Sequence, residues 1–280
     1  MSSARSRRAR LLVAAVALSS LALAACGSSD SSSDSTAAAT NASGVTLLKD
    51  GKLLVCTHLS YKPFQYKDEA GKVVGFDVDL MDLVAKKLGV EQEIVDIDFA
   101  QITSGAVFAA KKCDTGAAAT TITDERKNAI LFSDAYFSAT QALLVKKDSG
   151  IKDLAGLKDK KIGVQTDTTG QIYAEDNMAT NGYTVTVFDD MPTQLAGVLA
   201  GRVDGAINDN GVVYDYAKDN PTTEVVTEFH TGEEYGFMFQ KDNENATALA
   251  TLVNQVLTDA KADGSYNDIY KKWFGVDAPK

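Results

Sequence analysis

The fold is decided by residues 75–88, which read Gly75-Phe76-Asp77-Val78-Asp79-Leu80-Met81-Asp82-Leu83-Val84-Ala85-Lys86-Lys87-Leu88. The apolar positions 80, 83, 84 and 88 recur at helical spacing and so form one face of a helix. Asp77 and Asp79 lie in the expected first turn, where carboxylates favour the positive end of the helix dipole. Together with the apolar run before Gly75, the stretch predicts a strand that turns into an amphipathic helix over 77–88.

Short apolar strands alternate with helical stretches along the rest of the chain. We expect strands at 53–57, 93–97, 117–122, 143–146, 161–165, 185–188, 205–208 and 236–239. We expect helices at 101–112, 124–130, 169–180, 192–200 and 245–262, followed by an aromatic-rich amphipathic helix at the end. Such alternation predicts the α/β class with parallel sheets, and the restart of the pattern after residue 146 predicts two lobes.

The first 25 residues have the composition of a bacterial signal peptide. Arginines at positions 5, 7, 8 and 10 precede an apolar stretch over 11–25 that is too short to span a membrane as a helix. The sequence Leu23-Ala24-Ala25-Cys26 resembles a lipobox, which implies that Cys26 becomes the lipid-bearing first residue of a lipoprotein. The alternative is an ordinary signal peptide with a coincidental cysteine, and export by the Sec or twin-arginine route stays open. Residues 26–44 then predict a lipid anchor and a disordered tether, because they hold almost no large apolar side chain.

Charge and composition exclude several classes of function. The chain has a net charge of -10, and removal of a leader with four arginines and no acids leaves -14. An acidic surface argues against nucleic-acid binding. His58 and His230 are the only histidines and no Cys-x-x-Cys pair occurs, so we expect no metal and no cofactor. Cys56 and Cys113 either form a disulfide or stay free, because bridging distance cannot be deduced from sequence.

As a string, residues 75–88 resemble the signature of the bacterial extracellular solute-binding proteins of family 3, and the likeness extends from about Leu53 to Gly275. The resemblance implies a periplasmic-binding-protein-like type II fold, in which two α/β lobes joined by two crossover strands enclose a ligand cleft. It places the first lobe at 45–140 and 235–280 and the second at 141–234, with crossings near 138–143 and 233–237. It also implies a monomeric, extracytoplasmic, membrane-anchored receptor that is not an enzyme and delivers an L-amino acid to an ABC permease.

The resemblance further implies which residues of the first lobe hold the amino acid. Residues 118–126 read AATTITDER and resemble the family segment in which Thr121 and Arg126 bind the α-carboxylate, with Ala119 beside them. A guanidinium suits this task because it donates two parallel hydrogen bonds to a carboxylate. Without the resemblance, Arg126 is interpreted as a solvated helix residue.

In the second lobe, residues 163–170 resemble the family's second anion contact, to which Gln165, Thr168 and Thr169 belong. The family usually has glycine where Asp167 stands, which leaves the local turn open. Asp209 matches the family residue that pairs with the α-ammonium, at the carboxyl end of a strand where α/β sheets bind ligands. Taken alone, Asp209 is an ordinary turn residue.

His58, Tyr61 and Phe99 resemble the positions that contact the ligand's side chain. Aromatic walls at Tyr61 and Phe99 suit aliphatic stems and cationic heads, although core filling is the alternative. Relatives that select basic amino acids or glutamine often carry aspartate at the position of His58. A histidine, with its ordinary pKa of about 6.5, weakens the case for lysine or arginine. We therefore expect a polar L-amino acid and leave neutral, acidic and basic side chains open.

Two other classes of function compete with the receptor. Some relatives on this fold are dehydratases that act on cyclic precursors of aromatic amino acids, and such chemistry needs a positioned acid in the cleft. No carboxylate with a paired base stands out in the sequence. An amino-acid sensor lipoprotein is the third interpretation.

Overall fold

The computed structural model describes residues 44–279. The expected signal peptide over 1–25, the lipidation site Cys26 and nearly all of the tether over 26–44 lie outside these residues. Within 44–279, no helix combines the length and hydrophobicity needed to cross a bilayer.

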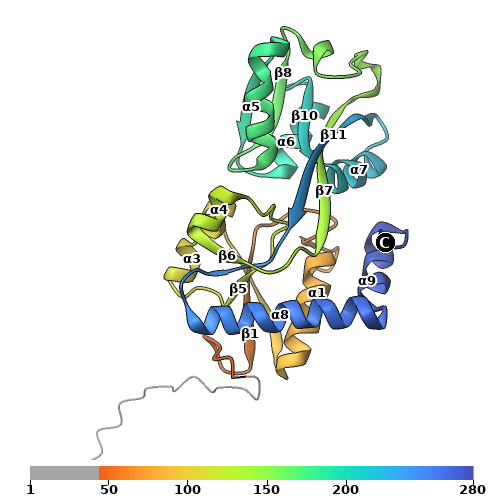
Figure 1. Cartoon of the computed structure of the whole chain (residues 1–280). Helices are drawn as coiled ribbons and strands as arrows, with labels where there is room; N and C mark the ends of the chain where they lie inside the picture. Colours follow the sequence, from red (N-terminus) through yellow and green to blue (C-terminus); the bar gives the residue numbers. More distant parts are fainter. Residues whose placement is uncertain (1–43, 280) are drawn as a thin grey trace, which may run out of the picture. The chain divides into compact units, whose positions relative to one another are not determined.

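The first lobe is built on a five-stranded sheet (Figure 1). Its strands, in spatial order, are β4 (Glu91–Asp96), β1 (Lys52–Thr57), β5 (Thr115–Gly116), β12 (Met238–Gln240) and β6 (Ile130–Phe132). The helices of this lobe are α1 (Phe76–Leu88), α2 (Phe99–Thr103), α3 (Ala106–Ala109), α4 (Asp124–Ala129), α8 (Glu244–Asp263) and α9 (Ser265–Phe274). A two-stranded ribbon, β2 (Tyr66–Lys67) and β3 (Val73–Val74), leads into α1.

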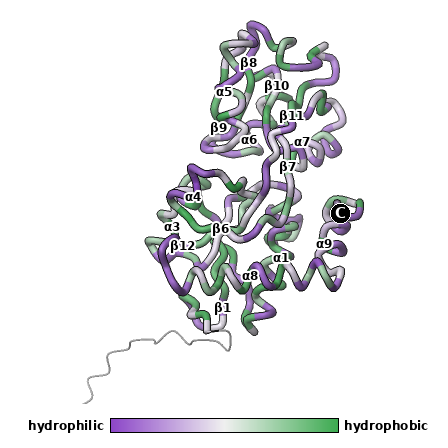
Figure 2. Tube along the Cα trace, viewed as in Figure 1, coloured by the Kyte–Doolittle hydropathy of each residue, from purple (hydrophilic) through white to green (hydrophobic). Residues whose placement is uncertain are grey.

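The second lobe is built on another five-stranded sheet. Its spatial order is β11 (Thr223–Tyr235), β7 (Phe137–Lys146), β10 (Gly205–Asp209), β8 (Lys161–Gln165) and β9 (Thr184–Phe188). Its helices are α5 (Thr169–Asn181), α6 (Met191–Leu199) and α7 (Asn210–Asp219), and single 3-10 turns lie at Lys147–Ser149 and Ala155–Leu157. Figure 2 shows hydrophobic residues along β8 and β10, where Ile162, Val164 and Ile207 are buried.

Two long strands carry the chain between the lobes. β7 and β11 pair antiparallel from Thr223 with Lys146 to Tyr235 with Phe137. The first sheet lies immediately beyond this end, because β6 ends at Phe132 and β12 begins at Met238. The expected two α/β lobes joined by two crossover strands are therefore confirmed, while the exact lobe bounds stay a prediction.

The stretch over 75–88 forms α1 as expected. Gly75 precedes the helix with a φ of 147°, and a Cβ built on it would lie 1.9 Å from the carbonyl oxygen of Phe64. Three of the four residues of the predicted apolar face are buried and Leu83 is half-buried. Phe76 of this helix packs edge-on against Tyr266 and Phe274 of α9. The aromatic helix at the chain end therefore covers the first lobe.

Several expectations about secondary structure were wrong. The helix expected over 101–112 is broken into α2 and α3 by Gly105, whose φ of 77° is left-handed. The strand expected over 117–122 is replaced by the two-residue β5 just before it, and Ala119 within the expected range adopts a left-handed φ of 46°. The sheets are mixed instead of parallel. β7 runs antiparallel to β10 and β11 in the second sheet, and β12 runs antiparallel to β5 and β6 in the first. β6 and α7 were not predicted, and β11 was expected only at its crossover end near 233–237.

Cys56 and Cys113 form a disulfide, with their Cα atoms 5.6 Å apart. The bridge ties β1 to the segment that enters β5, and both cysteines are buried. It fixes the base of the loop that carries His58, because Cys56 stands only two residues before it.

Candidate functional site

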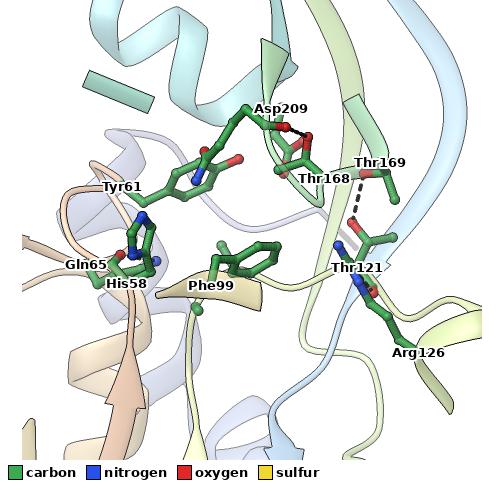
Figure 3. Close-up of a pocket in the computed structure, with 12 residues that line it drawn as sticks. His58, Tyr61, Gln65, Phe99, Thr121, Arg126, Thr168, Thr169 and Asp209 are labelled. Carbon is green, nitrogen blue, oxygen red and sulfur yellow. Dashed lines mark hydrogen bonds between the residues drawn. The ribbon is translucent and has the colours of Figure 1, made fainter. Parts of the chain in front are cut away.

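One cavity brings together all ten of the residues expected at a ligand (Figure 3). It lies between loops of the first lobe and the strand ends of the second. The expected residues in its wall are His58, Tyr61, Phe99, Ala119, Thr121, Arg126, Gln165, Thr168, Thr169 and Asp209. Gln65 and Ala118 also line it and were not predicted. The structure shows that these ten residues line one cavity, whereas their roles in binding a ligand stay predictions.

Arg126 reaches both lobes from α4. Thr123 caps this helix by accepting from the Arg126 backbone N–H, which orients the arginine at the cavity. The guanidinium donates to the carbonyl oxygens of Thr121 at 2.9 Å and Asp167 at 2.8 Å, and its carbon lies 5.3 Å from the centre of the Phe99 ring. Desolvation lowers the pKa of Arg126, and the charge of Asp209 opposes that shift. Among the described residues, no carboxylate forms an ion pair with Arg126.

Asp209 supplies a buried carboxylate at the opposite wall. It ends β10 and precedes α7, and its oxygens accept hydrogen bonds from Gln141 and Tyr235. Burial raises the pKa of Asp209 to about 6, and repulsion by Glu233 adds to the shift. Within 44–279, no Lys, Arg or His forms an ion pair with Asp209. A cation placed here would therefore find a carboxylate already desolvated.

Glu233 sets the direction of two threonine hydroxyls. Thr121 donates to one of its oxygens at 2.7 Å, and Thr169 donates to the same oxygen at 2.8 Å. A hydroxyl has a single proton, so in this arrangement both threonines offer only lone pairs to a ligand. A lone pair of this kind can accept from an ammonium, and the expected contact of Thr121 with an α-carboxylate stays a prediction.

The turn before α5 holds its shape with aspartate in place of the usual glycine. Asp167 adopts a left-handed φ of 58°, and its backbone N–H donates to the side-chain oxygen of Gln171. Aspartate tolerates this conformation better than most residues. Thr168 caps α5 by accepting from the Gln171 backbone N–H, so Thr169 starts the helix at the cavity.

The remaining wall is formed by His58, Gln65, Tyr61 and Phe99. The Tyr61 hydroxyl donates to the side-chain oxygen of Asn208 at 2.6 Å, and this bond links the two lobes. The Nδ1 atom of His58 lies 3.0 Å from the carbonyl oxygen of Ile97. This carbonyl orients the ring, so that Nε2 is the nitrogen left for other partners.

The sequence interpretation missed the residues that support the site from the crossover strands. Gln141 of β7 donates to Asp209 and Glu233, and Tyr235 of β11 donates to Asp209. The sequence does hold a signal for Gln141. Residues 139–145 are apolar except for Thr140 and Gln141, and Gln141 is the only amide among them. Groups of His, Cys, Asp or Glu that could hold a metal ion do not occur in the described part of the chain.

Comparisons with known proteins match most of the chain. The model of the bacterial extracellular solute-binding proteins, family 3, matches residues 53–276. The arginine-binding extracellular protein ArtP of Bacillus subtilis (strain 168) is 33% identical over 267 residues, which covers 94% of this chain and 97% of ArtP. An ancestral arginine-binding protein bound to arginine has 42% identity and a TM-score of 0.74, and the match covers 80% of this chain and 98% of that one.

A further solved structure is an ancestral amino acid-binding protein described as a precursor of cyclohexadienyl dehydratase. It has 36% identity and a TM-score of 0.74, and the match covers 80% of this chain and 96% of that one. The structural neighbours share the two-lobed type II periplasmic-binding-protein fold, so the expected fold class is confirmed.

Proposed function

We propose that this chain, which belongs to the bacterial extracellular solute-binding proteins of family 3, is a receptor that binds a polar L-amino acid between its lobes. The arginine-binding relatives support an amino-acid ligand. The proposal extends to delivery of that amino acid to an ABC permease by a monomeric protein.

The observation that carries the proposal is the placement of two opposite charges in one cavity. Arg126 comes from the first lobe and Asp209 from the second, and within the described residues neither has an ion-pair partner. An amino acid brings a carboxylate for Arg126 and an ammonium for Asp209 and the two threonine oxygens. Burial of both ligand charges is then offset by paired contacts.

These contacts also explain how the ligand drives closure. A ligand held by residues of both lobes interacts more strongly with a closed form than with an open one. It therefore shifts the population towards closure by this difference in free energy. The closed form is the one that we expect the permease to recognise.

The anchoring part of the proposal rests on sequence. The lipobox-like Leu23-Ala24-Ala25-Cys26 supports cleavage before Cys26 and lipidation of that cysteine. Residues 26–44 then tether the receptor to the outer face of the cell membrane. Replacement of Cys26 by serine tests this: the protein is expected to be released from membranes, and retention in the membrane fraction would refute the anchor.

The binding proposal is tested by the melting temperature of the mature protein with each common L-amino acid. Binding to the native state alone stabilises it by about 2.7 kcal/mol at a hundredfold excess of ligand over Kd. We expect a clear increase with one chemical group of amino acids. No increase with any amino acid, in protein refolded free of carried-over ligand, would refute the receptor.

A dehydratase is the second candidate, favoured by the ancestral neighbour and by the raised pKa of Asp209. A carboxyl group with a pKa of about 6 is able to transfer a proton near neutral pH. The test is incubation with a cyclohexadienyl amino-acid precursor and detection of the aromatic product. We expect no turnover, and turnover that is lost in Asp209→Asn would favour the enzyme.

A further inference from the structure

Unpartnered polar atoms gather in the wall of the cavity. Five buried side-chain atoms of the described residues lack a hydrogen-bond partner, and three of them belong to cavity residues. These three are Nε2 of His58, Oε1 of Gln65 and Oε1 of Gln165. Gln65 is 1% exposed and Gln165 is 2% exposed. Buried polar groups without partners are costly, so each of these atoms calls for a ligand group.

All three atoms are hydrogen-bond acceptors. The Oε1 atoms of Gln65 and Gln165 are amide carbonyl oxygens, which cannot donate. His58 places Nδ1 3.0 Å from the carbonyl oxygen of Ile97, which can only accept. Nδ1 therefore carries a proton, so that the neutral form of the ring presents a lone pair at Nε2. A ligand group that satisfies this set must bring N–H or O–H donors.

Two of the acceptors, on His58 and Gln65, lie where a side chain would end. Figure 3 shows Phe99 between Arg126 on one side and His58 with Gln65 on the other. An amino acid whose carboxylate binds Arg126 would therefore direct its side chain past Phe99 towards His58 and Gln65. Gln165 ends β8 in the second lobe, so the set includes both lobes.

The charge around the cavity favours a cation. Asp209 and Glu233 are two buried carboxylates, and Arg126 is the guanidinium that faces them. A zwitterion with a neutral side chain adds no net charge, whereas a cationic side chain adds the positive charge that balances the second carboxylate. The aromatic rings of Tyr61 and Phe99 also suit a cation.

We propose that the ligand is a cationic L-amino acid whose side chain ends in N–H donors without acceptors, and that His58, Gln65 and Gln165 determine this specificity. A guanidinium, with five donors, matches three separate acceptors better than an ammonium does. The inference rests on the proposed function, and it reverses the sequence-based expectation that His58 weakens the case for arginine. A carboxylate side chain brings only acceptors and is excluded.

The first test is a calorimetric titration of the mature protein with L-arginine, L-citrulline and L-glutamate. Citrulline has nearly the shape of arginine but is neutral and replaces N–H donors by a carbonyl oxygen. Arginine is expected to bind at least about tenfold more tightly than citrulline, and glutamate is expected not to bind. Citrulline or glutamate as the tighter ligand would overturn the inference and leave the receptor intact. No binding of any amino acid would overturn the proposed function itself.

The second test removes the acceptors one at a time. Gln65→Met and Gln165→Met keep the length of the side chain and are each expected to weaken arginine binding by about tenfold to a hundredfold. Gln92→Met is the matched control, because its Oε1 is also buried and unpartnered but lies outside the cavity. Unchanged arginine affinity in both cavity variants, with melting temperatures like that of Gln92→Met, would overturn the inference.

Discussion

The guanidinium of Arg126 in the first lobe donates a hydrogen bond of 2.8 Å to the carbonyl oxygen of Asp167 in the second. The same side chain donates to Thr121 of its own lobe at 2.9 Å. Arg126 is therefore both a candidate ligand contact and a bond between the lobes. Loss of its charge is expected to weaken ligand binding and lobe closure together.

Removal of either candidate charge should greatly weaken amino-acid binding. Arg126→Ala and Asp209→Ala are each expected to cost about 2–5 kcal/mol of binding free energy, because the opposite ligand charge is left buried and unpaired. Isothermal titration of the folded variants measures this cost. Arg202→Ala and Asp189→Ala serve as controls, since both residues are exposed and neither lines the cavity. Wild-type affinity in both cavity variants would rule out this site.

Amino-acid affinity should fall in acid because of Asp209. Burial raises the pKa of Asp209 to about 6 without ligand, whereas a bound ammonium favours the ionised carboxylate. Below this pH the protein must release a proton when it binds, so affinity falls by up to about tenfold per pH unit. Titrations in two buffers of different ionisation enthalpy count that proton. Asp209→Asn should lose this pH dependence, and equal slopes in both proteins would contradict the assignment.

Asp77 should make the protein less stable as the pH rises. Its carboxylate accepts from the Ala119 N–H at 2.8 Å and from the Tyr136 hydroxyl at 2.8 Å, yet burial raises its pKa to about 7. The folded state therefore keeps a proton that the unfolded state releases above its ordinary pKa of 3.8. Between these values the free energy of unfolding is expected to fall by about 4 kcal/mol.

Urea unfolding across this pH range measures the effect of Asp77 by comparison with Asp77→Asn. The variant loses a hydrogen bond at every pH, so the readout is the slope against pH and not the absolute stability. The slope of the wild type should be more negative by the contribution of Asp77. Parallel curves for the two proteins would show that Asp77 does not titrate in this range.

Gly75 should tolerate no side chain. Gly75→Ala would place a Cβ 1.9 Å from the Phe64 carbonyl oxygen, so α1 or the loop before it must move, at a cost of at least about 3 kcal/mol. Gly71→Ala is the matched control, because Gly71 also has a positive φ but has no atom within 4 Å of the added Cβ. The control is expected to cost about 1–2 kcal/mol in urea unfolding. Equal losses of stability in the two variants would mean that the positive φ alone explains the need for glycine at position 75.

The disulfide should stabilise the protein without setting ligand affinity. Cys56 and Cys113 close a loop of sequence separation 57, and reduction is expected to lower the free energy of unfolding by about 2–4 kcal/mol. A double serine variant should show the lower stability with or without reductant. A reductant effect that persists in this variant would assign the effect to another cause.

Local sequence patterns predicted the helices and strands whose form depends mainly on residues close in sequence. The helix over 77–88 follows from its apolar spacing and Gly75, and the strand over 161–165 is observed with the expected bounds. The segment 117–122 reads as a strand by composition, but the bond from Ala119 to the distant Asp77 accompanies a left-handed turn there. No local pattern reports a contact across 42 residues.

The cavity residues were predicted through the family resemblance, residue by residue. The support from Glu233 and Gln141 was missed because it depends on the pairing of β7 with β11, whose partners lie about ninety residues apart. Only this pairing brings Glu233 to the threonines of both lobes. The interpretation of His58 also depends on a distant contact. The carbonyl oxygen of Ile97 lies beside Nδ1, which leaves Nε2 as the nitrogen without a partner.

Recognition of both charges of one amino acid is the central claim, and a single calorimetric comparison tests it most directly. The mature protein is titrated with the amino acid that binds most tightly, with its carboxamide and with its N-acetyl form. Loss of either charge is expected to weaken binding by about a hundredfold or more, because Arg126 or Asp209 then faces an uncharged group. Equal affinity for all three compounds would contradict the account.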